Sequence, residues 1–114
     1  MRLGFIGGGN MAEALLRGVL RSGLASPGEV VVSEPREERR EQLRERHGVE
    51  VVWDNAEAVR RAEVVVLAVK PKDVERALEG VEFTAEHLVL SIVAGLTLGH
   101  LQGMVRPART VRTM

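Results

Sequence analysis

The feature that most constrains the fold is a run of three glycines directly after a short apolar segment. Leu3–Ile6 has the composition of a buried strand, and Gly7-Gly8-Gly9-Asn10-Met11-Ala12 follows it in the pattern G-x-G-x-x-A. Gly7 permits a sharp turn, the missing Cβ of Gly9 lets a pyrophosphate approach the backbone, and Ala12 allows close helix–strand packing. The N–H groups at the start of the following helix can then bind phosphate. This context predicts the dinucleotide-binding turn of a Rossmann domain.

Two other interpretations of the turn are weighed against this one. A glycine turn can pack a helix against a strand and bind nothing, but three adjacent glycines lose more conformational entropy than a purely structural turn requires. A mononucleotide P-loop needs Gly-Lys-Ser or Gly-Lys-Thr after the turn, and the chain has Asn10-Met11-Ala12 there.

Apolar runs and helical patterns alternate along the chain, which predicts an α/β domain with a doubly wound parallel sheet and right-handed crossovers. The expected strands are Leu3–Ile6, Val30–Val32, Val49–Val52, Val64–Val69, Leu88–Val93 and Arg109–Met114. The expected helices run from an N-cap at Asn10 to Ser22-Gly23, from Glu37 to His47, after Asp54 or Asn55, over Asp73–Leu78, and after Thr97. We expect residues 1–114 to form one domain, and the extended last segment suggests truncation within a longer protein.

The apolar residues of the first helix predict which side of it is buried. Met11, Ala14, Leu15, Gly18 and Val19 recur at helical spacing and should face the core. The segment from Arg36 to Arg46 alternates arginine with glutamate, which favours a solvated helix face that buries chiefly Leu43.

Composition argues against several classes of function. The net charge is +0 and aromatic residues make up 3% of the chain, so neither a basic patch nor base-stacking platforms are expected. There are no cysteines and no stretch of membrane-spanning length, and we expect a cytoplasmic protein without a metal site. His47, His87 and His100 are expected at the surface, and Trp53 is expected to pack in the core or at an edge.

The residues after the second strand bear on the choice of cofactor. Glu34 lies where an acidic residue often accepts hydrogen bonds from the adenosine ribose, which favours NAD and disfavours a 2′-phosphate. Ser33 and Arg36 favour the opposite choice, because a hydroxyl and a guanidinium suit a phosphate. An ordinary polar loop is the third alternative. The sequence therefore predicts NADP or NAD without deciding between them.

Three separate segments resemble the pyrroline-5-carboxylate reductase family in order and spacing. They are Phe5-Ile6-Gly7-Gly8-Gly9-Asn10-Met11-Ala12, then Leu67-Ala68-Val69-Lys70-Pro71, then Leu90-Ser91-Ile92-Val93-Ala94-Gly95-Leu96-Thr97. The closing Val111-Arg112-Thr113-Met114 is similar to that family's strand before a Met-Pro-Asn-Thr-Pro segment. The resemblance covers essentially the whole chain and implies hydride transfer from NAD(P)H to 1-pyrroline-5-carboxylate, which yields L-proline. It also implies a following helical domain, absent from this sequence, that forms the family's homo-oligomer and most of its substrate pocket.

The resemblance also implies which residues bind the cofactor. Gly7, Gly8, Gly9, Asn10 and Met11 would hold the pyrophosphate; Ser33, Glu34, Arg36 and Asn55 would lie near the adenosine; Ala68, Val69, Lys70 and Pro71 would line the cleft; and Ala94 and Gly95 would flank the nicotinamide. Glu34 departs from the family, in which many members have a neutral residue there and prefer NADPH. Lys70 is considered as a catalytic acid, but a shaping Lys-Pro turn is the favoured interpretation, and no catalytic residue is predicted.

Two alternatives stay open. The chain could be the cofactor domain of another NAD(P)-dependent or deazaflavin-dependent reductase, because these enzymes share the strand, glycine turn and helix. It could also be a stand-alone nucleotide-binding module. The Lys-Pro segment and the segment Ser91–Gly95 favour the reductase of the resemblance.

Overall fold

The computed structural model describes residues 1–113, and its strands alternate with helices as the sequence predicts. The strands are β1 Leu3–Ile6, β2 Val30–Ser33, β3 Glu50–Val52, β4 Val64–Leu67, β5 Leu88–Ser91 and β6 Arg109–Arg112. The helices are α1 Asn10–Ser22, α2 Glu37–His47, α3 Asn55–Arg60, α4 Val74–Leu78 and α5 Leu98–Val105, with 3₁₀ turns η1 Pro27–Glu29 and η2 Pro71–Asp73. The last expected strand residue, Met114, lies outside the described residues.

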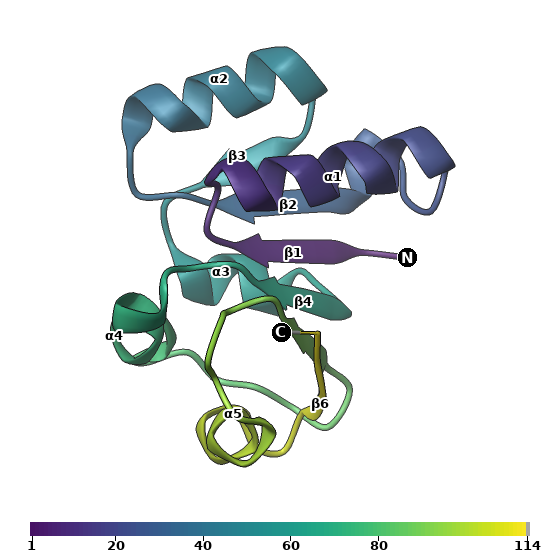
Figure 1. The fold of residues 1–114 in the computed structure, drawn as a ribbon. Helices are drawn as coiled ribbons and strands as arrows, with labels where there is room; N and C mark the ends of the chain where they lie inside the picture. Colours follow the sequence, from purple (N-terminus) through teal and green to yellow (C-terminus); the bar gives the residue numbers. More distant parts are fainter. Residues whose placement is uncertain (114) are drawn as a thin grey trace.

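The six strands form one parallel sheet in the order β3-β2-β1-β4-β5-β6 (Figure 1). This is the strand order of the doubly wound dinucleotide-binding fold, so the predicted fold class is confirmed. The order reverses at β1, because the chain first moves outward to β3 and then returns to β4 on the other side. Such a reversal creates a crevice beyond the carboxyl ends of the central strands.

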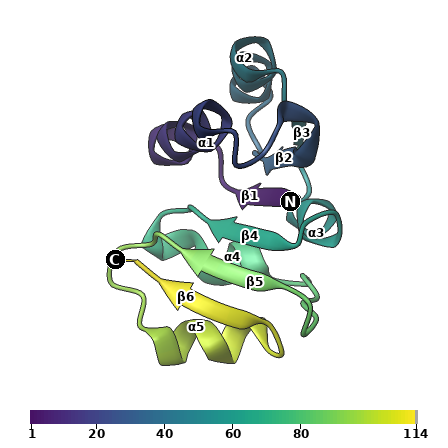
Figure 2. The same cartoon turned by 90° about the vertical axis from the view of Figure 1, so that its right-hand side faces the viewer.

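Helices cover both faces of the sheet, and each face has its own hydrophobic core. Helices α1 and α2 lie on one face, while α3, α4 and α5 lie on the other (Figure 2). Phe5, Leu16 and Leu43 are buried in the first core, whereas Ile6, Val65 and Leu101 are buried in the second. Neighbouring residues of β1 thus point to opposite faces, as the period of two in a strand requires.

The buried side of α1 differs from the sequence prediction. Ala12, Glu13 and Leu16 are buried, whereas Met11 is 57% exposed and Ala14 is exposed. The N-cap is Gly9, not Asn10, and it makes no side-chain capping bond. The apolar pattern is confirmed in part, because Leu15 and Val19 pack partly buried against the first core. It misses Glu13, whose charge is compensated by groups from α2.

Three other expectations, about polar and aromatic residues, are wrong in whole or in part. His87 is 7% exposed, because its ring is satisfied inside the protein: Nδ1 accepts from the Thr84 N–H at 3.0 Å and Nε2 donates to the Val59 carbonyl at 2.9 Å. The side chain of His47 is 9% exposed and contacts Glu13. For Trp53 the core alternative is wrong, because its side chain is 72% exposed; the residue directly follows β3, at the edge of the sheet.

The other expectations for surface residues are confirmed in part. His100 is exposed, as expected. Most arginines between Arg36 and Arg46 are exposed or half-buried, and Leu43 is buried as predicted, but Arg39 is also buried. Among the described residues, no helix has the length and apolar character needed to cross a membrane.

Candidate dinucleotide-binding site

The ends of the central strands are level with one another, which brings distant segments together. Ile6 of β1 pairs with Ser33 of β2 and with Leu67 of β4. Gly7, Glu34 and Ala68, the residues that follow these strands, therefore lie at one edge of the sheet. The Gly7 N–H donates to the Ser33 carbonyl at 2.9 Å, and the Ala68 N–H donates to the Ile6 carbonyl at 2.9 Å, which fixes the start of each loop.

Grooves at this edge gather most of the residues that the sequence singled out. One groove of about 410 Å³ is lined by Gly7–Gly9, Glu34–Arg36, Ala68–Lys70, Lys72 and Asp73. A second, of about 420 Å³, shares Gly7 and Val69 with it and is also lined by Ser33, Trp53 and Asn55. A third, of about 290 Å³, contains Pro71, Ala94 and Gly95. Asn10 and Met11 are exposed at the start of α1, beside Gly9.

The three glycines of the turn differ in how far the fold itself requires them. Gly7 has φ +103°, and a Cβ there would lie 2.6 Å from the Ala68 carbonyl oxygen. A Cβ at Gly8 would lie 2.8 Å from Leu43 Cδ1. Gly9, by contrast, has φ −78° and ψ −170°, which any residue adopts, and a Cβ there would meet nothing within 4 Å. The fold of residues 1–113 therefore explains Gly7 and Gly8 but not Gly9.

Backbone donors at the start of α1 lack acceptors among the described residues. The first helical N–H with an acceptor within residues 1–113 is that of Glu13, which donates to the Gly9 carbonyl at 2.9 Å. The N–H groups of Gly9, Asn10 and Met11 precede it, and no described residue accepts from them. Unsatisfied N–H groups and the helix dipole favour an anion at such a position.

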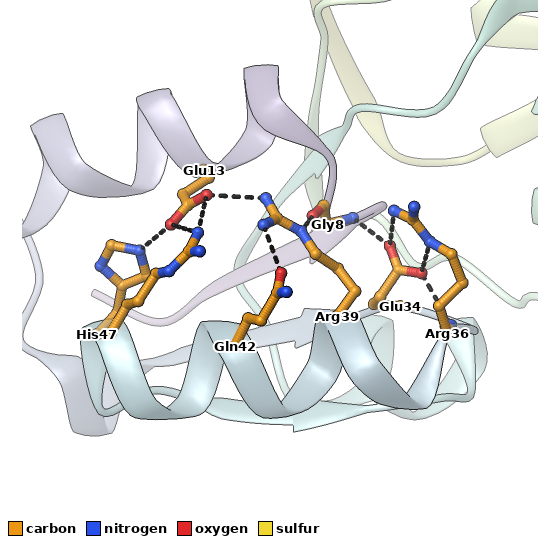
Figure 3. A network of polar contacts seen from close by, with 8 residues as sticks. Gly8, Glu13, Glu34, Arg36, Arg39, Gln42 and His47 are labelled. Carbon is orange, nitrogen blue, oxygen red and sulfur yellow. Dashed lines mark hydrogen bonds and ion pairs between the residues drawn. The ribbon is translucent and has the colours of Figure 1, made fainter.

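Glu34 and Arg36 form an ion pair at the end of β2 (Figure 3). The Glu34 carboxylate is buried and accepts from the Arg36 Nε and N–H at 2.9 and 2.8 Å, and from the Gly8 N–H at 3.2 Å. Burial raises the pKa of the Glu34 carboxyl, but the hydrogen bonds and charge of Arg36 outweigh it, so the pKa lies below its usual value. The Arg36 side chain remains 66% exposed, and it is the charged group of this pair that the groove presents.

Ser33 and Asn55 contact each other beneath the second groove. The Ser33 hydroxyl is fully buried and donates to Asn55 Oδ1, and the Asn55 amide donates to the Ala77 carbonyl at 2.9 Å. The structure thus brings these two predicted residues together and joins β2 to α3 and α4. Their polar atoms are engaged within the protein, in contrast to the exposed guanidinium of Arg36.

Behind the turn, a buried polar cluster connects α1 to α2 (Figure 3). Arg39 donates from Nη2 to Glu13 Oε1 at 2.8 Å, and His47 Nε2 donates to Glu13 Oε2 across 2.6 Å. Arg46 contacts both Glu13 oxygens at 3.3 Å. The hydrogen bond from His47 and those from Arg39 and Arg46 outweigh burial and lower the pKa of Glu13 to about 2. Glu13 is therefore ionised over the whole neutral range.

Comparison with known proteins gives the family. Residues 2–95 match the family model described as NADP oxidoreductase, coenzyme F420-dependent. The chain belongs to this family. Pyrroline-5-carboxylate reductases from Methanosarcina acetivorans and Synechocystis are 35% and 42% identical over 99% and 90% of the chain. The structure of a pyrroline-5-carboxylate reductase from Coxiella burnetii superposes with a TM-score of 0.87 at 30% identity and 99% coverage. The resemblance found in the sequence is thereby confirmed.

The chain spans about two fifths of the length of these relatives. It covers 43% of the Methanosarcina protein, 39% of the Synechocystis protein and 43% of the Coxiella structure. The matched part is their N-terminal cofactor-binding domain. A pyrroline carboxylate reductase from Plasmodium falciparum, solved with NADP bound, shares the fold with a TM-score of 0.83 at 24% identity.

The site of this oxidoreductase-family chain also contains residues that sequence reasoning missed. Lys72 and Asp73 of η2 line the first groove, and Trp53 lines the second. Lys72 could have been found from its position just after a strand end. Arg39 could not, because its contact with Gly8 is 31 residues away in the sequence and the charge pattern of α2 indicated a solvated face. In residues 1–113, no group of three or more His, Cys, Asp or Glu side chains is arranged to hold a metal ion.

Proposed function

We propose that this chain is the NAD(P)H-binding part of a pyrroline-5-carboxylate reductase, which reduces the C=N bond of 1-pyrroline-5-carboxylate to give L-proline. The observation that carries the proposal is the glycine turn after β1, where the N–H groups of Gly9, Asn10 and Met11 have no acceptor among the described residues and a Cβ at Gly9 would meet nothing within 4 Å. A phosphate ligand at this backbone would account for the free donors and for glycine at position 9 together. The coverage of almost the whole chain by pyrroline-5-carboxylate reductases supports the choice of substrate.

The phosphates of the cofactor fit the turn and the start of α1. The N–H groups of Gly9, Asn10 and Met11 would donate to the pyrophosphate, while Gly7 and Gly8 give the turn its shape. Lys70 and Lys72 add positive charge beside the same groove. Glycine at position 9 and free backbone donors are both suited to a pyrophosphate, so the residues present fit the cofactor.

The two ends of the cofactor would lie on either side of this turn. The adenosine ribose would lie near Glu34 and Arg36, with Ser33 and Asn55 supporting that side of the second groove. The nicotinamide supplies the hydride when bound. Ala68, Val69, Lys70 and Pro71, together with Ala94 and Gly95, would form the wall on that side. This wall consists mainly of backbone and small or apolar side chains, which position a flat ring and exclude water from it.

A second candidate is hydride exchange between NADP and coenzyme F420, which the name of the matching family model favours. Either candidate predicts NADP binding at the glycine turn. Titration of the chain with oxidised coenzyme F420 beside NADPH separates them, because binding of F420 would favour the second candidate. Formation of proline from 1-pyrroline-5-carboxylate by an enzyme that contains this chain would favour the first.

The Gly9→Val variant tests the site. A branched side chain at position 9 would occupy the space that the pyrophosphate needs, so we expect loss of measurable NADPH and NADH binding in calorimetric titration. The backbone angles of Gly9 suit valine, and its Cβ would meet nothing within 4 Å, so the variant should fold, with at most a modest loss of stability because valine is a poorer N-cap than glycine.

Gly18→Val is the matched control. Gly18 is exposed on α1, and a Cβ there also meets nothing within 4 Å, but it lies two turns away from the glycine turn. This variant should bind both cofactors like the unchanged chain. A folded Gly9→Val variant with unchanged cofactor affinity would count against the assigned site.

A further inference from the structure

The middle glycine of the turn is held from both sides by charged side chains of other segments (Figure 3). Its N–H donates to Glu34 Oε1 at 3.2 Å, and its carbonyl accepts from Arg39 Nε at 2.6 Å. Arg39 is buried, and its other nitrogens donate to Glu13 Oε1 at 2.8 Å and Gln42 Oε1 at 3.2 Å. A buried guanidinium with all three nitrogens engaged has a single orientation.

The contact with Gly8 acts on Gly9 through the peptide bond that joins them. The Gly8 carbonyl and the Gly9 N–H belong to one planar unit, in which C=O and N–H point in opposite directions. Arg39 fixes the carbonyl, and it thereby fixes the direction of the Gly9 N–H away from α2. A hydrogen bond accepted by the carbonyl also polarises the peptide, which makes its N–H a stronger donor.

Arg39 does not itself face the groove. It lies behind the turn, is absent from the lining of the first groove, and its charge is compensated by Glu13. Glu13 is held in turn by His47 and Arg46. The cluster thus couples the carboxyl end of α2 to the phosphate-binding turn.

We infer that Arg39 is a positioning residue for the cofactor: it aims the Gly9 N–H at the pyrophosphate and keeps the turn in its binding conformation before the cofactor arrives. The inference rests on the proposed function, because it assigns a task to the same turn. It concerns the pyrophosphate, which NADPH and NADH share, so Arg39 should not influence the choice between them.

Arg39→Gln tests this role by titration with NADPH and NADH and by the amide resonance of Gly9 in ¹⁵N-labelled protein. We expect affinity for both cofactors to fall by about tenfold, with their ratio unchanged. The Gly9 amide resonance should shift in the absence of any cofactor. Arg46→Gln is the matched control, because Arg46 contacts the same Glu13 but not Gly8. It should keep the unchanged chain's affinity and Gly9 resonance, even where it lowers the unfolding midpoint.

The affinity and the Gly9 resonance of the Arg39 variants decide whether Arg39 has this role. A folded Arg39→Gln variant with unchanged affinity and an unmoved Gly9 resonance overturns the inference. Should that variant not fold, Arg39→Lys replaces it. A lysine keeps the charge beside Glu13 but has a methylene where Arg39 Nε donates to Gly8, and one nitrogen in place of three, so the same two changes are expected and their absence overturns the inference. If the unchanged chain binds neither cofactor, the proposed function fails, while the Gly9 resonance still decides whether Arg39 orients this peptide.

Discussion

Glu34 and Arg36 are the residues on which we expect the choice of cofactor to depend. Glu34 could accept from a ribose diol, but both of its oxygens already accept from Arg36 and one also accepts from Gly8. The exposed group is the Arg36 guanidinium, whose remaining N–H groups suit a 2′-phosphate. The 2′-phosphate of NADPH would thus contact Arg36, whose charge Glu34 partly neutralises. The ribose diol of NADH would contact Glu34, whose oxygens already accept hydrogen bonds from Arg36.

Glu34→Ser is expected to raise the affinity for NADPH relative to NADH. The change removes a negative charge beside the 2′-phosphate and releases Arg36, and one charged hydrogen bond is worth about 1.5–3 kcal/mol, or roughly tenfold or more in the ratio. The loss of the acceptor for the Gly8 N–H affects both cofactors and cancels in that ratio. Calorimetric titration with each cofactor measures it.

Glu41→Ser is the matched control for Glu34→Ser, because it removes the same charge at a site outside the grooves. Glu41 is exposed on α2 and lines none of the grooves at the strand ends. Its replacement should leave the ratio of the two affinities unchanged. A Glu34→Ser variant whose ratio equals that of the unchanged chain would show that Glu34 has no part in cofactor choice.

At the scale of elements, the packing of α2 on α1 depends on a charge cluster as well as on Leu43. The pKa of Glu13 is lowered from 4.5 to about 2 by His47, Arg39 and Arg46. A carboxyl group with a lowered folded-state pKa stabilises the protein above its unfolded-state pKa, and this contribution is lost as the pH falls through the folded-state pKa. The contribution of Glu13 is therefore complete above about pH 5 and is lost between about pH 5 and 2.

Glu13→Gln should accordingly lower the free energy of unfolding by about 3 kcal/mol at neutral pH, because it leaves buried Arg39 without its counter-charge. It should also make the loss of stability between pH 5 and 3 shallower. Urea unfolding at pH 7, 5 and 3 measures both effects. A remaining slope belongs to Glu29, Glu34 and Glu50, whose pKa values are also lowered.

The same substitution at exposed Glu38 of α2 serves as the control and should change neither the stability at neutral pH nor its acid dependence. Equal acid dependence in the Glu13→Gln variant and the unchanged chain would contradict the role assigned to the cluster.

Comparison of the predicted and observed helices and strands shows which parts of the structure follow from local sequence. The glycine turn, the alternation of strands and helices, and Thr97 as the cap of α5 depend on neighbouring residues, and all were predicted. The burial of Glu13 in α1 was not, because its charge is compensated by partners that lie 26 to 34 residues away. His87 was missed for the same reason, since its acceptor is the carbonyl of Val59, 28 residues earlier. Long-range pairing of charged and polar groups overrides local pattern.

For the molecule as a whole, one edge of the sheet carries the candidate site, and strand order determines which segments reach it. The glycine turn, the end of β2 and the end of β4 meet because β1 lies between β2 and β4. Sequence spacing alone located the candidates, but only the register shows that Ser33 and Leu67 are level with Ile6. The candidate cofactor site is thus a product of topology, and we expect the residues at each strand end to modify its specificity.

The 114-residue chain should bind the cofactor without forming proline. Its described residues provide the phosphate-binding turn and one wall of a groove, and it spans 43% of the Methanosarcina relative and 39% of the Synechocystis relative. Reduction of an imine needs a hydride on carbon and a proton on nitrogen, with the substrate held in line. The sequence resemblance implies that most of the substrate pocket belongs to a further, helical domain. We therefore expect saturable NADPH binding and no proline above the buffer level when the chain is incubated with NADPH and 1-pyrroline-5-carboxylate. The full-length Synechocystis reductase, assayed in parallel, should form proline, and comparable turnover by the 114-residue chain would contradict this division of tasks.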